Sequence, residues 1–136
     1  MNNQNFKWQP FEKIGGKFGN ITISINSAGG IGFLSGMWHK YNLQNMTYVK
    51  LFFSLDNSKN PVLGFKFTQD KHLAGVYKLT LNRSSASVSP NAFWAAHGII
   101  PENYVGSYAP NEMIDKDFGQ IFYIVLNKNL KLKNNG

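Results

Sequence analysis

The sequence predicts a mostly β protein of the α+β class, in which two similar units, each with one short helix, interleave their strands into one small β-barrel-like core. The first observation is the strict alternation of apolar and polar residues along residues 21–26, which is the period of a half-buried strand. The second is an order of strand, turn, short strand, helix and two further strands that occurs twice, at a constant offset of 56 residues. The third is composition, because 136 residues that are 43% apolar and 15% aromatic suffice to build a core.

The first unit is expected to span residues 20–68. Gly29 and Gly30 follow the alternating strand and predict a tight turn, because glycine adopts positive φ without steric cost. Ser35 is the predicted N-cap of a helix that ends at Asn42, a residue that tolerates the left-handed conformation. The other strands of this unit are predicted at residues 31–34, 48–55 and 62–68.

The second unit is expected to span residues 76–127, after a linker of residues 69–75. Pro90 stands where its helix begins, a position at which a missing N–H is tolerated, and Gly98 is a favoured residue just past a helix end. Strands are predicted at residues 76–82, 87–89, 103–109 and 120–127, with a loop at residues 110–119. Outside the units, we expect an N-terminal extension with an edge strand, residues 1–19, and a basic flexible tail, residues 128–136.

The repeat offset aligns four identical residues in the two units: Asn26 with Asn82, Trp38 with Trp94, Tyr48 with Tyr104, and Val49 with Val105. A unit of about 50 residues is too small to bury a core alone, so the two units would have to pack together. The two tryptophans lie in the predicted helices and are expected in the shared core rather than on a surface that stacks bases. The alternative is a chance match between two ordinary strand and helix segments.

Three segments resemble the AbrB/MazE-like swapped-hairpin domain: "NSAGGIGFL" at residues 26–34, "SGMWHKYNL" at residues 35–43, and "PNAFWAAHGI" at residues 90–99. That family has a strand, a glycine turn, a short apolar strand ending in Pro, a short helix and a Leu-Gly-Ile exit followed by two more strands, and Leu34 stands in place of that Pro in the first unit. The tandem arrangement is similar to that of the MraZ regulators. The resemblance implies interleaved units and binding of duplex DNA through basic loops and strand faces, although Trp38 and Trp94 stand where the family has Arg.

Basic residues exceed acidic ones by 14 to 7, for a formal net charge of +7. Such an excess favours binding to phosphate backbones. A compositional bias would produce the same excess, since every basic residue except Arg83 is Lys and Asn is abundant. We expect a nucleic acid as partner, DNA in preference to RNA and duplex in preference to single-stranded DNA, through Lys–phosphate contacts rather than Arg reading of guanine edges.

The candidate nucleic-acid-binding residues are cations and turn residues: Lys17, Lys40, Lys50, Lys66, Lys78 and Arg83, with Asn26, Ser27, Ser84 and Ser85 as donors to phosphate. Arg83 is the strongest single candidate, because it follows Asn82 in the turn equivalent to the glycine turn of the first unit. The N-terminal "FKWQPFEK", residues 6–13, interleaves aromatic residues with lysines, so it would either stack single-stranded bases or form an edge strand.

No sequence pattern indicates an enzyme, a metal site or a cofactor. Cysteine is absent, the histidines His39, His72 and His97 lack ligand spacing, and Asp115 and Asp117 are interpreted as solvated loop residues. We expect a non-enzymatic, cytoplasmic DNA-binding protein, a small transcription regulator or accessory factor, with no membrane segment and with homo-oligomers as an option. The alternative is a protein-binding module, an antitoxin-like or phage-encoded inhibitor, that docks on an acidic partner surface.

Overall fold

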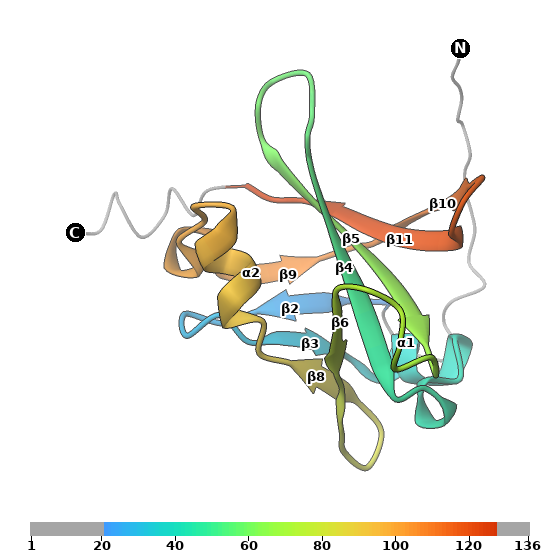
Figure 1. Cartoon of the computed structure of the whole chain (residues 1–136). Coiled ribbons are helices and arrows are strands. Elements are labelled where there is room, and N and C mark those ends of the chain that lie inside the picture. The colour runs from blue at the N-terminus through green and yellow to red at the C-terminus, as the bar shows by residue number, and fades with distance from the viewer. Residues whose placement is uncertain (1–20, 128–136) are drawn as a thin grey trace.

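The computed structural model describes residues 21–127 and contains two antiparallel sheets of five strands each, with two short helices (Figure 1). The predicted extension and tail lie outside the described residues. The first sheet has the order β7-β8-β3-β2-β9, with bounds Thr80–Leu81, Ala86–Val88, Ile31–Phe33, Ile23–Ile25 and Gly106–Tyr108. The second sheet has the order β10-β11-β5-β4-β6, with bounds Asn111–Asp115, Gly119–Val125, Pro61–Thr68, Tyr48–Leu55 and Val76–Lys78.

The strands of the two sheets cross, with β4 and β5 running steeply past β2, β3 and β9 (Figure 1). The chain passes from one sheet to the other three times: through the helix Ser35–Lys40 between β3 and β4, at Leu79 between β6 and β7, and at residues 109–110 between β9 and β10. Leu79 is buried, and its N–H still bonds to the carbonyl of Thr47 before the chain changes sheet. Both sheets are open, so the mostly β, α+β class is confirmed, whereas closure into a barrel is not.

The helices α1 (Ser35–Lys40) and α2 (Asn91–Ala96) begin 56 residues apart, as the repeat predicts. Ser35 is not a cap, because it is the first residue of α1 and no side chain caps this helix. Asn42 adopts the left-handed conformation with φ of 57°, and Gly98 does so after α2 with φ of 64°. Each helix buries its tryptophan and the residue before it: Met37 and Trp38 in α1, and Phe93 and Trp94 in α2.

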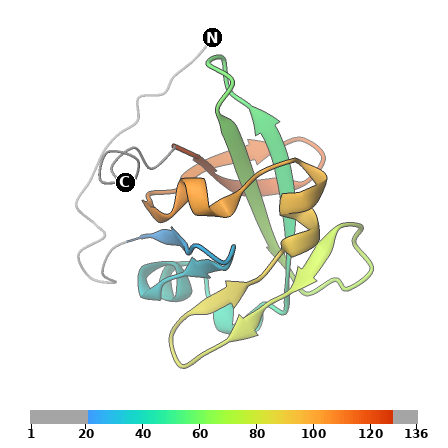
Figure 2. The same cartoon turned by 90° about the vertical axis from the view of Figure 1, so that its left-hand side faces the viewer.

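Strands from the first half of the chain (residues 21–68) pair directly with strands from the second half (residues 76–127). β3 pairs with β8, where Gly32 is opposite Ser87, and β5 pairs with β11, where Phe65 is opposite Phe122. One buried apolar cluster draws its side chains from both halves. Neither half therefore contains a complete core. The β4–β5 hairpin projects beyond the rest of the described structure in both views (Figure 2).

Gly29 packs against the tryptophan of the other half. Its φ is +95°, and its carbonyl accepts a hydrogen bond of 2.8 Å from Nε1 of the buried Trp94. A Cβ at position 29 would lie 2.8 Å from that Nε1 and 3.2 Å from the Pro101 ring. The glycine turn therefore serves the contact between the halves, where only the smallest residue fits.

Three predictions in the second half are wrong. The single strand predicted at residues 76–82 divides at Leu79 into β6 and β7, which belong to different sheets. Residues 110–119, predicted as a loop, contain β10, which pairs with β11 from Asn111 opposite Tyr123 to Asp115 opposite Gly119. The sequence hides this strand because it lies at a sheet edge, where most of its residues are exposed and do not alternate in polarity. The strand predicted at residues 103–109 is shortened to β9, because Pro101–Tyr104 forms a 3-10 turn.

We expect Trp94→Ala to lower the free energy of unfolding by about 3–5 kcal/mol, because it removes a buried ring and leaves the Gly29 carbonyl without its donor. Urea unfolding followed by far-UV circular dichroism measures this loss, and Trp38→Ala should behave alike. Both variants should unfold in one transition, since the core is shared. Separate transitions for the two halves would contradict a shared core.

Gly29→Ala should destabilise the fold more than Gly98→Ala. Both positions have positive φ, but a Cβ at position 98 meets nothing within 4 Å, whereas one at position 29 collides with Trp94. We expect a loss of about 1 kcal/mol for Gly98→Ala and of about 2–3 kcal/mol for Gly29→Ala, measured by urea unfolding. Equal losses would show that the collision with Trp94 is relieved without cost.

Candidate nucleic-acid interface

Three of the predicted lysines share one face of the second sheet. Lys50 and Lys66 stand directly opposite each other in the β4–β5 ladder, and Lys78 stands opposite Tyr48, two residues from Lys50 on β4. Residues opposite each other or two apart share a face, and the intervening Leu51 points into the core. This surface of the second sheet is called the outer face below. Opposed lysines repel each other, so an anion bound there would relieve an unfavourable pair.

Aromatic rings hold Lys50 in place on the outer face. Phe52 packs edge-on against Phe118 from the β10–β11 turn, with ring centroids 5.0 Å apart. The Lys50 Nζ lies 5.2 Å from the Phe52 centroid and 5.5 Å from the Phe118 centroid, and it donates a hydrogen bond of 2.7 Å to the Ala74 carbonyl. An ammonium group has three donors, so Lys50 keeps N–H groups for a further acceptor.

A hollow of about 520 Å³ opens on the outer face beside these rings. Gly64 forms its floor, with Phe52 opposite it on β4 and Tyr123 opposite it on β11. The strands that carry these two residues are two strand spacings apart, roughly 9.5 Å between backbones, and Gly64 adds no side chain between them. A Cβ at position 64 would lie 3.1 Å from Phe52 and 3.3 Å from Ile121, so any larger residue would crowd the floor. The other lining residues are Phe53, Ser54, Val62, Met113 and Asp115.

Asp115 supplies a fixed carboxylate to the wall of this hollow. Its Oδ2 accepts hydrogen bonds from the N–H groups of Asp117 and Phe118, at 2.9 Å and 3.0 Å. Within residues 21–127, no group donates to its Oδ1. The hollow therefore combines aromatic walls, an available acceptor and a lysine beside its rim.

The polar residues predicted in the turns do not join the outer face. They lie in the β2–β3 turn (Asn26 and Ser27) and in the β7–β8 turn (Arg83, Ser84 and Ser85). Because β3 and β8 run antiparallel, these turns lie at opposite ends of the first sheet. Asn26 closes its own turn, since its Oδ1 accepts hydrogen bonds from the N–H groups of Ala28 and Gly30. Arg83 is exposed, and Lys17 lies outside the described residues.

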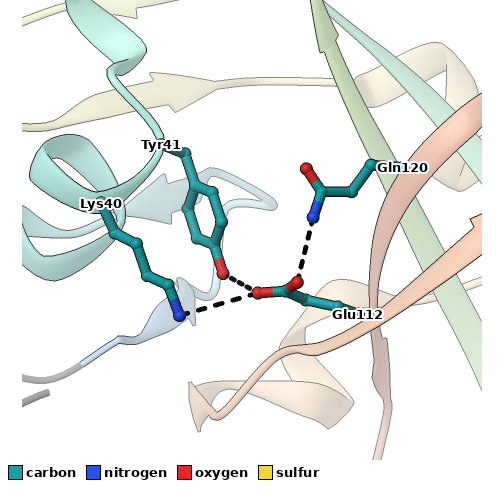
Figure 3. A network of polar contacts seen from close by, with 4 residues as sticks. All are labelled: Lys40, Tyr41, Glu112 and Gln120. Atoms are coloured by element: carbon teal, nitrogen blue, oxygen red, sulfur yellow. Dashed lines mark hydrogen bonds and ion pairs between the residues drawn. The ribbon is translucent and has the colours of Figure 1, made fainter. Parts of the chain in front are cut away.

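Lys40 belongs to a polar network that ties α1 to the β10–β11 hairpin (Figure 3). Oε2 of Glu112 accepts a hydrogen bond from the Tyr41 hydroxyl and lies 3.7 Å from Nζ of Lys40. Oε1 of Glu112 accepts a hydrogen bond of 3.0 Å from Nε2 of Gln120. Burial and the neighbouring Glu112 carboxylate raise the pKa of the Tyr41 hydroxyl above its ordinary value. The network joins the two halves on the face of the β10–β11 hairpin opposite the hollow.

The aromatic residues of the outer face were missed in the sequence. Tyr48, Lys50 and Phe52 alternate along the predicted strand of residues 48–55, and this period gave the signal that they share a surface. Phe118 and Tyr123 come from a segment distant in sequence, so no local pattern could place them beside Phe52.

No known protein family, curated protein or solved structure matches this chain. Among residues 21–127, no three His, Asp or Glu side chains gather in an arrangement that could hold a metal ion. No helix in this part of the chain combines the length and the apolar character needed to cross a membrane. The geometry of the outer face is therefore the basis for a functional proposal.

Stability should fall as the pH rises above about 10. Tyr41 has a raised pKa in the folded state, so the unfolded chain loses this proton first and deprotonation favours unfolding. Below the ordinary tyrosine pKa both states are protonated and the contribution of the network is fully present. Urea midpoints measured between about pH 8 and pH 11 should decline less steeply for Tyr41→Phe. An identical alkaline decline in the variant and the natural chain would contradict this role for Tyr41.

Proposed function

We propose that the protein binds nucleic acid without catalysing a reaction, and that the outer face of the second sheet contacts a single strand. One observation carries this proposal: three lysines and three partly exposed aromatic residues share this surface, namely Lys50, Lys66, Lys78, Phe52, Phe118 and Tyr123. Lysines neutralise phosphates and aromatic rings stack on bases, and this combination is typical of surfaces that bind single strands.

The hollow favours a single strand over the duplex expected from the sequence. Bases in a duplex are paired and stacked, so they cannot enter a recess between Phe52 and Tyr123. A single strand can splay its bases into such a recess while its phosphates lie along the lysines. Arg83 and the other turn residues, on which duplex binding would depend, belong to turns of the first sheet and are not part of the outer face.

Local placement of charge supports the proposal more strongly than net charge does. Residues 21–127 contain eight basic residues against six acidic ones, because six of the fourteen basic residues lie nearer the chain ends. On the outer face, however, the lysines number three. Among the described residues that line the hollow, Asp115 is the acidic one. Lys50 lies against the Phe52 and Phe118 rings, and Lys66 stands opposite Lys50 in the ladder.

We also infer that the two halves are copies of one unit, as the AbrB/MazE-like resemblance implies. In the β3–β8 ladder, Ile31 is opposite Val88 and Gly32 is opposite Ser87. At the repeat offset, Ser87 is the equivalent of Ile31 and Val88 the equivalent of Gly32. The ladder is thus unchanged when the halves are exchanged, which is the pairing expected of an isologous contact between two copies.

A lysine double variant tests the proposed surface. Lys66→Gln with Lys78→Gln should weaken binding of a fluorescent single-stranded DNA and flatten the slope of log affinity against log salt by about 1.4, since each lost phosphate contact removes about 0.7. The matched control is Lys59→Gln with Arg83→Gln, which removes the same charge from two exposed turns. The control should keep the natural slope.

The outcomes of this experiment separate three accounts. Equal losses in both double variants would show that bulk charge, not the outer face, drives binding. A loss confined to the Lys59 and Arg83 variant, with duplex DNA bound more tightly than single strands, would restore the turns as the site. No binding of any nucleic acid at low salt would refute the proposed function and leave a protein partner as the alternative.

A further inference from the structure

We propose that the hollow on the outer face binds one unstacked guanine base of the strand, with Asp115 accepting hydrogen bonds from the edge of that base. This inference rests on the proposed function, because lysines beside the hollow are what draw a polyanion to it. It adds a base preference that stacking and phosphate contacts alone would not produce.

The dimensions of the hollow suit a flat ring. Its volume of about 520 Å³ falls within the range of small-ligand sites. Phe52 and Tyr123 line the hollow from the strands on either side of Gly64, so each offers an aromatic ring to a base inside it. Only glycine fits at the floor, because a Cβ at position 64 would meet Phe52 at 3.1 Å and Ile121 at 3.3 Å.

The carboxylate of Asp115 selects the base. An ionised carboxylate only accepts hydrogen bonds, and its Oδ1 is available to a ligand. Guanine presents two adjacent donors, N1–H and the N2 amino group, with no acceptor between them. Adenine and cytosine place a ring acceptor beside their amino group, and thymine and uracil flank N3–H with two carbonyl oxygens. Guanine is therefore the base that a carboxylate attracts most strongly and repels least.

The position of Lys50 argues that this base belongs to a strand. Nζ of Lys50 lies over Phe52, which forms one wall, and Lys66 stands opposite Lys50 in the same ladder. Lys50 and Lys66 both lie two residues from the Phe52–Gly64 pair on the same side, so the phosphates on that side of the bound base can meet cations while the base occupies the hollow. A carboxylate beside a polyanion is unfavourable unless it makes a hydrogen bond, and the guanine edge supplies one.

Fluorescence anisotropy with oligothymidylates of about 12 nucleotides tests this inference. Replacing one central thymine by guanine should raise the affinity of the natural protein by about tenfold, and replacing it by hypoxanthine, which lacks the N2 amino group, should give less. Asp115→Asn should abolish the guanine preference, while the all-thymine strand binds as well as before or better. The amide oxygen of asparagine can take the place of the Asp115 Oδ2 as acceptor for the two turn N–H groups, so the variant preserves the turn.

Asp117→Asn is the matched control, because it removes the same charge from the same turn at a residue that does not line the hollow. It should keep the guanine preference. The inference is overturned if the natural protein binds both strands equally, or if the Asp115 and Asp117 variants change the preference alike. Competition by guanosine monophosphate as strong as that by the guanine-containing strand would overturn the strand as occupant. Failure to bind any strand would instead refute the proposed function.

Discussion

Antiparallel pairing between the two halves is the constraint on which the rest of the structure depends. The β3–β8 and β5–β11 ladders extend each sheet across both halves, and the Trp94 indole closes against the Gly29 carbonyl. Each half alone would leave one face of its strands and one edge of its ladder open to water. A small chain without cysteine must obtain its stability from packing. Pairing of the two halves supplies it, because it buries the open face and the open edge in a single step.

The same constraint creates the outer face. With alternate residues of β4 and β5 committed to the shared core, the pleat turns Lys50, Phe52 and Lys66 outward. Pairing of β5 with β11 then brings Tyr123 across Gly64 from Phe52, and the β10–β11 hairpin delivers Phe118 and Asp115 to the same place. The hollow is thus assembled from both halves. The β5–β11 ladder that joins the halves in folding also carries residues of the proposed binding surface. Loss of the pairing would remove both.

Local periodicity made much of the fold predictable, and long-range pairing set the limit. Apolar patterning, cap residues and the repeat in the sequence predicted β4, both helices and the buried indoles, all of which the structure contains. β10 escaped detection because an exposed edge strand needs no alternation. Of the candidate site residues, Lys50, Lys66 and Lys78 share a face, whereas Lys40 pairs with Glu112 and the turn residues lie at opposite ends of the first sheet. Only the pairing of distant strands decides such groupings.

Native-state hydrogen exchange tests the shared core most directly. Amides of the β4–β5 ladder lie within the first half, and amides of the β5–β11 ladder join the halves. If neither half is stable alone, the slowest amides of both ladders should exchange with the same free energy, equal to that of global unfolding. Protection of the β4–β5 ladder that persists after the β5–β11 ladder has opened would contradict the account, because the first half would then hold its structure without the second.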